Sequence, residues 1–286
     1  MKLCRFKHET DEIHIGLVGR NVVFDLAPAG ITRLLPLLED DNPVHAVARL
    51  AAGKLPRAPL SSVTLLAPVE GQEVWAAGVT HLRSRAARME ESNFNASAYH
   101  RVYAAKRPEI FFKSLPDKVV GPGEAVGIRR DARWSVPEPE LALVINSRGR
   151  IAGHTIGNDL SSRDIEGDNL LYLPQAKIYH RSCALGPWIH LGAPERQVRQ
   201  WTIRIKITRR GRAVFAGETS VGKIKRGFAQ LANYLFRCQK FPRGAILLTG
   251  TGIVPPDSFT LAAGDRIRIA IDPIGLLENV VVQGGL

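Results

Sequence analysis

The sequence predicts a β-rich α+β fold with few helices, and three observations support this class. The chain has 286 residues, 45% of them hydrophobic, which suffices for one large domain with a small appendage. Its 26 glycines and 18 prolines interrupt many Val/Ile-rich runs, as is typical of short strands joined by turns. Helical spacing of apolar residues is clear only near 224–238, where Ile224, Phe228, Leu231 and Leu235 recur. We therefore predict one packed helix there and strands over most of the remainder.

The chain divides into a small leading module and a larger main domain. Residues 1–60 contain two short strand-like runs and then helical pieces that end near Gly53, which predicts a small α/β module. The proline-rich link KLPRAPLSS then leads into the main domain, residues 61–286. Within it, a polar helical stretch at about 81–105 has too few apolar residues for a buried stripe, so we expect a lid or an exposed arm.

Charge and composition exclude several partner classes. The formal charge is +12, but the basic residues are scattered and match no nucleic-acid-binding motif, so we expect a basic surface and no nucleic-acid partner. The TGTG stretch at 249–252 lacks the lysine of a phosphate loop, so we expect no nucleotide. The absence of a long apolar run predicts no membrane partner, and Cys4, Cys183 and Cys238 lack metal or redox spacing. We expect a cytoplasmic protein with reduced thiols.

Two glutamates lie two residues apart in VPEPELALVI, where a predicted strand begins. Strand alternation directs Glu138 and Glu140 to the same face. The SRGR stretch that follows is a turn signal, because Gly149 can adopt a positive φ. Residues 140–146 and 151–159 are therefore predicted to form an antiparallel hairpin.

The length of the hairpin loop decides which residues oppose the glutamates. A loop of two or four residues sets Glu138 opposite Asp159 and Glu140 opposite Gly157, whereas a three-residue loop would shift this register. Directly opposed residues have Cβ atoms about 4.5–5.5 Å apart, so the three carboxylates should converge. The small partners Gly157, Thr155 and Gly153 predict a hollow above the acids.

Three carboxylates this close cannot all ionise unaided, because neighbouring negative charges and burial raise the pKa of each. A hard divalent cation resolves the conflict, and a set of oxygen ligands favours Mg²⁺, Mn²⁺ or Ca²⁺ over zinc. We therefore predict a metal site at Glu138, Glu140 and Asp159. The alternative is a solvated strand end whose acids pair with nearby arginines, a kind of contact that contributes little.

Several motifs resemble the fumarylacetoacetate hydrolase superfamily. PEPELALVI, GRIAGHTIGNDLSSRDI, LPQAKIYHRSCALGPWI, LLTGTG and PPDSFTLAAGDRIRIAIDPIGLLENVV match it in order over about residues 70–282. The resemblance implies a mixed β-roll or sandwich core, a catalytic domain at 61–286 and a homodimer or homotetramer. It also implies that Glu138, Glu140 and Asp159 hold Mg²⁺ or Mn²⁺.

The resemblance also implies a substrate class, since the family acts on 2-oxo acids and 1,3-dicarbonyl compounds that chelate the metal. Lys177, in QAK, matches the family's active-site lysine, and with the metal it would balance the charge of the three acids. Thr251, in TGTG, matches a position near the substrate carboxylate. The alternatives are a surface lysine at 177 and an ordinary turn threonine at 251.

One departure from the family pattern bears on the reaction. Hydrolase members carry G-x-N-Y-x-x-H-x-x-E after the strand that reads VWAAG here, and the His–Glu pair activates water. This chain reads GVTHLRSRAARMEES, so Ser84 takes the place of the histidine and Ala87 that of the glutamate. The hydrolytic pair is therefore predicted to be absent, unless a register shift lets His81 act with Glu90 or Glu91.

The same stretch, with RPEIFFK after it, resembles the sugar-acid dehydratase branch of the superfamily. That likeness implies a lyase that dehydrates a 2-keto-3-deoxy sugar acid, such as 2-keto-3-deoxy-D-arabinonate. The substrate loses a C3 proton and then its C4 hydroxyl, and the product is 2-oxoglutarate semialdehyde. Lys177 is the candidate C3 base and Glu109 the candidate that helps the hydroxyl leave, while Arg83 and Ser84 are candidate substrate contacts.

Two other functions remain open from the sequence. A hydrolase or decarboxylase of acylpyruvates or oxaloacetate would use the same metal site with His81 as base. A non-enzymatic basic scaffold would bind an anionic partner through its positive surface. Glu109 would then be a strand-end carboxylate paired with Arg107.

Overall fold

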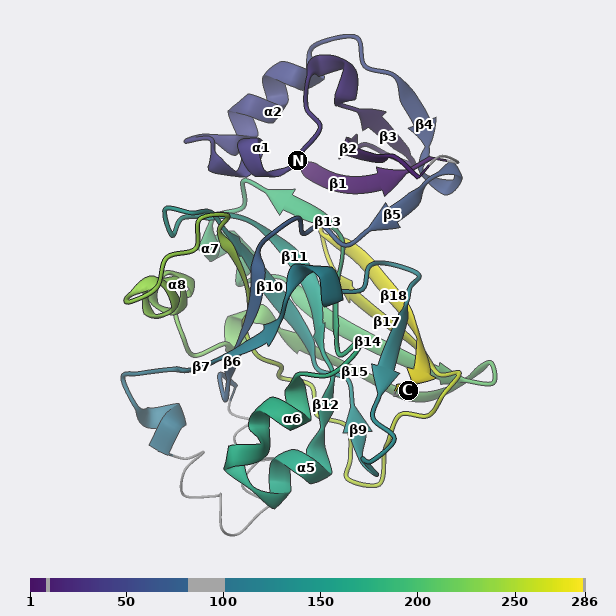
Figure 1. The fold of residues 1–286 in the computed structure, drawn as a ribbon, viewed down its shortest axis with the longest axis vertical. Helices are drawn as coiled ribbons and strands as arrows, with labels where there is room; N and C mark the ends of the chain where they lie inside the picture. The colour runs from purple at the N-terminus through teal and green to yellow at the C-terminus, as the bar shows by residue number, and fades with distance from the viewer. Residues whose placement is uncertain (9–10, 82–100, 285–286) are drawn as a thin grey trace.

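A long mixed sheet organises most of the protein (Figure 1). The computed structural model describes residues 1–8, 11–81 and 101–284. The order along the sheet is β4-β3-β2-β1-β13-β11-β10-β16-β6-β7, with β5 paired to β1, and only β16 and β6 run parallel within it. Its strands are β1 (Lys2–Lys7), β2 (Ile13–Val18), β3 (Val22–Asp25), β4 (Arg57–Pro59), β5 (Thr64–Leu66), β6 (Glu73–Gly78), β7 (Glu109–Ser114), β10 (Pro139–Ile145), β11 (Ile151–Asp159), β13 (Cys183–Leu191) and β16 (Ala245–Leu248).

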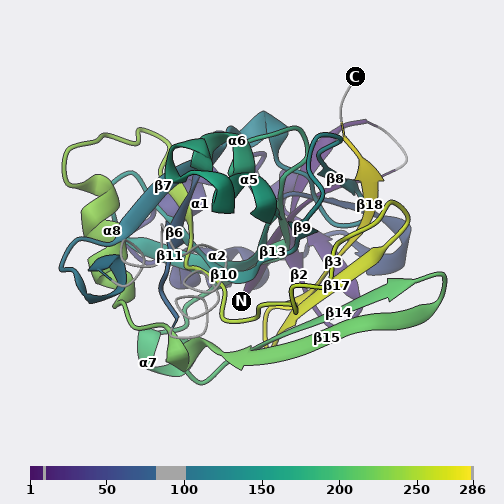
Figure 2. The same cartoon turned by 90° about the horizontal axis from the view of Figure 1, so that it is seen from below.

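A five-stranded sheet of order β15-β14-β17-β18-β8 packs against the long one, and Figure 2 shows β14, β15 and β17 along one flank. Buried residues of both sheets, such as Leu143 of β10 and Ile205 of β14, belong to one hydrophobic cluster. The α+β fold class predicted from the sequence is therefore confirmed. The strands are β8 (Ala125–Ile128), β14 (Thr202–Arg209), β15 (Arg212–Ser220), β17 (Arg266–Ile271) and β18 (Gly275–Gln283), with β9 (Ser135–Val136) and β12 (Ser161–Ser162) as a separate pair.

The helices are short and lie at the margins of the sheets. They are α1 (Leu35–Glu39), α2 (Pro43–Ala51), α5 (Arg163–Asp168), α6 (Leu173–Lys177), α7 (Glu195–Val198) and α8 (Phe228–Phe236), with 3-10 turns η1 (Ala27–Ala29), η2 (Leu60–Ser62), η3 (Pro116–Lys118), η4 (Leu170–Tyr172) and η5 (Val221–Lys223). The predicted packed helix is α8, which buries Phe228, Leu231 and Leu235. Across the described residues, no helix combines the length and the apolar character needed to cross a bilayer.

The first five strands with α1 and α2 form the upper end of the molecule in Figure 1. This part joins the rest through β1 and β13, where Leu3 pairs with Ile189. Leu3 and Leu38 also belong to the hydrophobic cluster that contains Ala142 and Leu248 of the long sheet. The boundary between residues 60 and 61 stays a prediction, because hydrogen bonds and apolar contacts both cross it.

The predicted β10–β11 hairpin forms in the predicted register. Glu140 pairs with Gly157, and the amide of Asp159 donates to the carbonyl of Glu138 at 3.0 Å. Gly149 has φ 76° in the turn, as expected. The pairing slips by one residue only near the turn, between Val144 and Ile145, so the slip does not disturb the carboxylate end.

The prediction of a hollow above the acids is wrong. A Cβ on Gly157 would lie 2.1 Å from Cδ2 of Leu248, and one on Gly153 would lie 2.6 Å from Cγ2 of Ile189. The small residues therefore make room for side chains of the neighbouring strands β16 and β13, which close the sheet surface there. The pocket beside the acids is formed instead by residues at the ends of β6, β7, β10 and β11 and by residues of the loops and helices next to them.

We predict that Gly157→Ala destabilises the protein, because the added methyl must displace the fully buried Leu248. The expected cost is about 1–3 kcal/mol, the usual range for an overpacked core. Denaturant unfolding should show it as a lower midpoint with an unchanged slope. Gly53→Ala is the matched control, since its Cβ would approach nothing closer than 3.4 Å. Equal stability of the two variants would contradict the prediction.

Candidate active site

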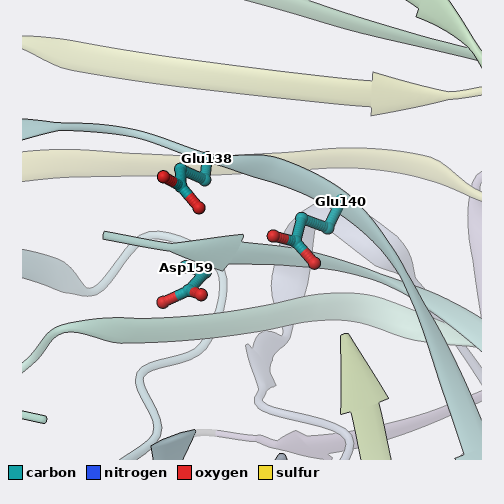
Figure 3. Close-up of side chains that lie close together, drawn as sticks. All are labelled: Glu138, Glu140 and Asp159. Atoms are coloured by element: carbon teal, nitrogen blue, oxygen red, sulfur yellow. The ribbon is translucent and has the colours of Figure 1, made fainter. Parts of the chain in front are cut away.

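Three buried carboxylates meet where β10 begins and β11 ends. One oxygen from each of Glu138, Glu140 and Asp159 lies within 4.8 Å of the others, and the residues are 4%, 1% and 1% exposed. Figure 3 shows the three side chains directed toward one another. The alternative of a solvated strand end is therefore wrong, because these acids are almost entirely buried.

The loop after β16 holds Glu140 in place. The amide of Gly250 donates to Oε2 of Glu140 at 2.5 Å. Gly250 has φ 89°, and a Cβ there would lie 2.2 Å from Oγ1 of Thr80. A side chain at position 250 would therefore be strained and would clash, which explains why the TGTG stretch carries glycine at this position.

Lys177 lies among the carboxylates. Its Nζ donates to Oε2 of Glu138 at 2.8 Å, to Oδ2 of Asp159 at 3.2 Å and to Oγ of Ser161 at 2.6 Å. The residue ends α6 and is 2% exposed, so the surface-lysine alternative is wrong. Its part in catalysis stays a prediction.

The sequence analysis missed two further buried cations. Nη2 of Arg163, at the start of α5, lies 2.9 Å from Oε1 of Glu138. Nζ of Lys113, on β7, lies 2.5 Å from Oδ1 of Asp159. The available signal was a basic residue inside or beside an apolar run, in EIFFKS and LSSRDI. That signal is weak, because nothing local shows that these side chains turn inward.

The pocket beside the triad contains two of the other predicted site residues. Glu109 and Thr251 line it, and so do Phe111 and the buried Glu166, which the sequence analysis did not single out. A Cβ on Gly78 would lie 2.1 Å from Oε2 of Glu109, so this glycine makes room for the carboxylate. The structure thus places Glu109 and Thr251 at the triad, while their roles stay predictions.

The structure does not bring the remaining predicted residues to the pocket lining among the residues it describes. Arg83 and Ser84, with positions 87, 90 and 91, fall outside the described residues. His81 is buried behind the TGTG loop, where a Cβ on Gly252 would lie 2.5 Å from its Cδ2. Burial, and then the charge of Lys223, lowers the pKa of His81 to about 4.

The charges in the pocket suit one divalent cation. Among the described residues, five carboxylates face three cationic side chains, so the formal charge is −2. Burial, and then Asp159 and Glu138, raises the pKa of Glu140 well above its ordinary value. Oδ1 of Asp159 accepts no hydrogen bond from the described residues, although Lys113 lies close to it. Carboxylate oxygens alone form the ligand set, which fits Mg²⁺ or a similar hard ion.

Family comparison agrees with the fold and the site. The model of the fumarylacetoacetate (FAA) hydrolase C-terminal domain matches residues 79–282. The chain therefore belongs to the fumarylacetoacetate hydrolase family, as its motifs indicated.

Individual relatives narrow the likeness further. The chain is 44% identical over 214 residues to a probable 2-keto-3-deoxyxylonate dehydratase of Haloferax volcanii, covering 75% of this chain and 73% of that protein. It is 38% identical over 260 residues to a 2-dehydro-3-deoxy-D-arabinonate dehydratase of Saccharolobus solfataricus, covering 85% and 87%. A solved structure of 2-keto-3-deoxy-D-arabinonate dehydratase with magnesium and 2,5-dioxopentanoate superposes with a TM-score of 0.81 at 33% identity, covering all of both chains.

We predict that Glu140→Gln stabilises the metal-free protein at pH 8. The raised pKa means that ionising Glu140 costs folding free energy, and this cost appears as pH rises above the ordinary glutamate value. Removing a cost of about 1 kcal/mol would raise the melting temperature by about 2–4 °C. Mg²⁺ should raise the melting temperature of the wild type, more at pH 8 than at pH 5 because protons compete for the ligands, and should not raise that of the variant.

Thermal melts of EDTA-treated protein with and without Mg²⁺ measure both effects. Glu218→Gln is the control, because Glu218 is exposed on β15. The metal site would be refuted if Mg²⁺ stabilised Glu140→Gln as strongly as the wild type.

Proposed function

We propose that the protein is a metal-dependent hydro-lyase that dehydrates a 2-keto-3-deoxy sugar acid of the pentonate class to 2-oxoglutarate semialdehyde, which is 2,5-dioxopentanoate. The observation that carries the proposal is the position of Lys177, whose ammonium lies between two carboxylates of a buried triad. The dehydratase relatives and the magnesium complex of one of them support the same reaction.

Glu138, Glu140 and Asp159 would hold the cation, and we propose Mg²⁺, with Mn²⁺ or Ca²⁺ as possible substitutes. Bound there, the ion would supply Lewis acidity toward the 2-oxo acid and stabilise negative charge that develops on its oxo oxygen. The substrate carboxylate and oxo group would then face Thr251, which lines the same pocket.

Lys177 would remove the C3 proton as a neutral amine, the form that the charge of a cation bound at the triad favours. Its Nζ already contacts the triad, so a substrate seated on the cation would bring C3 near this amine. Ser161 accepts a hydrogen bond from the same Nζ at 2.6 Å and so fixes its direction. The base is thus oriented before substrate arrives, which lowers the entropic part of the barrier.

Glu109 would protonate the departing C4 hydroxyl. It lines the pocket from the first residue of β7, on the same strand face as Phe111. Arg83 and Ser84 would contact the rest of the sugar chain. The assignments of Arg83 and Ser84 rest on the motif likeness alone.

Hydrolysis or decarboxylation of acylpyruvates or oxaloacetate is the weaker alternative. It needs a water-activating base at the triad, and the proposed base His81 is absent from the pocket lining among the described residues. The likeness to the dehydratases also favours dehydration. A purely scaffolding role does not account for a buried triad of carboxylates.

We further propose that the protein works in the cytoplasm as a homodimer or homotetramer, with a small 2-oxo acid as substrate. The absence of a membrane-spanning helix in the described residues is compatible with this setting. Sedimentation of the purified protein tests the oligomeric state.

Incubation with Mg²⁺ and 2-keto-3-deoxy-D-arabinonate should yield 2,5-dioxopentanoate, detected by NMR. Lys177→Met should lower kcat by about 10²–10⁴, the usual contribution of a general base, and Glu109→Gln should also lower kcat. Lys240→Met is the control, because Lys240 is exposed and does not line the pocket among the described residues. Failure to dehydrate any member of a panel of pentonate and hexonate analogues would refute the proposal.

The hydrolase alternative makes a separate prediction about His81. We expect no pyruvate from acylpyruvates, and we expect His81→Gln to keep dehydratase kcat within about threefold, since no transition-state contact is lost. Pyruvate release that disappears in His81→Gln would establish the alternative.

A further inference from the structure

Lys113 is a fully buried cation that the proposed chemistry does not use. Lysine is almost never fully buried unless its charge is paired. We infer that Lys113 is a positioning residue, which fixes the carboxylate of Asp159 and the backbone of Lys177 at the same time. The catalytic part of this inference rests on the proposed function, whereas the positioning part does not.

The contacts of Lys113 join two segments. Its Nζ lies 2.5 Å from Oδ1 of Asp159 and donates to the carbonyl of Leu160 at 3.0 Å, both at the end of β11. It also donates to the carbonyl of Lys177 at 2.5 Å, at the end of α6. Two of the three donors of this ammonium therefore serve backbone carbonyls, while its charge lies beside Asp159. Lys113 therefore links the strand that supplies one triad acid to the helix that supplies the proposed base.

The backbone of β7 is adapted to this role. Val74 of β6 pairs with Ser114 and Trp75 pairs with Phe112, so Lys113 is the extra residue of a β-bulge. Bulges next to active sites re-aim side chains and locally increase the twist. Glu109 and Phe111, which share one face of β7 before the bulge, line the pocket, and Lys113 reaches Asp159 from the bulge itself. One strand thus supplies two pocket-lining residues and the cation behind them.

Loss of Lys113 should disturb both Asp159 and the backbone of Lys177. Asp159 would keep Lys177 as a cationic partner at 3.2 Å, but Oδ1 would lose its neighbouring charge. The Lys177 carbonyl belongs to the last turn of a five-residue helix, where carbonyls lack helical partners. Within the described part of the chain, it would keep the hydroxyl of Ser182, which donates at 2.9 Å. The carboxylate of Asp159 and the Nζ of Lys177 would then each sample several positions.

A second buried aspartate in the chain provides the matched control. Asp265 is 0% exposed and pairs with Arg209 at 2.7 Å, and neither residue lines the pocket among the described residues. Arg209→Met and Lys113→Met each remove the cation beside a buried aspartate. Only Lys113→Met should affect the candidate active site.

The experiment compares three variants in two measurements. Lys113→Met removes the charge and the donors, Lys113→Gln keeps donors for the carbonyls without charge, and Arg209→Met is the control. Hydrogen exchange of the metal-free proteins should be faster in peptides that cover α6 for Lys113→Met, intermediate for Lys113→Gln and unchanged for Arg209→Met. At saturating Mg²⁺, Lys113→Met should lower kcat by about 10²-fold, as a misplacement of about 1 Å does, with KM changed by less than about threefold.

Two outcomes would overturn the inference. The first is unchanged exchange over α6 in Lys113→Met, or in Lys113→Gln where the methionine variant does not fold. The second is a loss of kcat in Arg209→Met as large as in the Lys113 variants, which would indicate general destabilisation. Faster exchange with no dehydration by the wild type would refute the proposed function and leave the positioning role supported.

Discussion

The repulsion between three buried carboxylates is the constraint on which the rest of the site depends. Their oxygens lie within 4.8 Å of one another and away from water, where charges interact far more strongly than in solution. Lys177, Arg163 and Lys113 each contact an acid and offset part of this cost. The negative charge that remains is what a divalent cation would neutralise. Without a metal, the carboxylate cluster therefore lowers the stability of the fold, and a bound divalent cation would offset this cost. Such a cost is expected where function and stability conflict.

The fold places this unfavourable cluster where backbone, and not only side chains, can stabilise it. The triad lies at strand ends, so the amide of Gly250 is free of the sheet and can donate to Glu140. The cationic side chains come from β7, α5 and α6, whose residues contact the acids at these strand ends. A centre of this kind inside the sheet would lack such donors, because ladder hydrogen bonds use the backbone groups there.

Local patterns determined what the sequence could predict. Glu138 and Asp159 were paired correctly, because a turn with Gly149 fixes the register of a hairpin between them. Lys113 could not be found in this way, since it reaches Asp159 across 46 residues and its direction depends on a bulge. The same limit explains why the prediction of a hollow at Gly157 was wrong: Leu248 fills this space from a strand about 90 residues later. Contacts within one hairpin can be predicted from the sequence, whereas contacts between hairpins can be identified only from the three-dimensional structure.

The choice of reaction depends on groups outside the triad. Any 2-oxo acid that chelates a cation at Glu138, Glu140 and Asp159 would present the same carboxylate and oxo oxygens. What happens next would be decided by the groups beside C3 and C4, and the pocket offers an amine and carboxylates for these places: Lys177 among the acids, with Glu109 and Glu166 in the lining. An amine beside C3 favours proton abstraction, and a carboxylic acid nearby favours loss of a hydroxyl over attack by water. A strand that carries both Glu109 and Lys113 would therefore link the proposed acid of the second step to the support of the proposed base in the first.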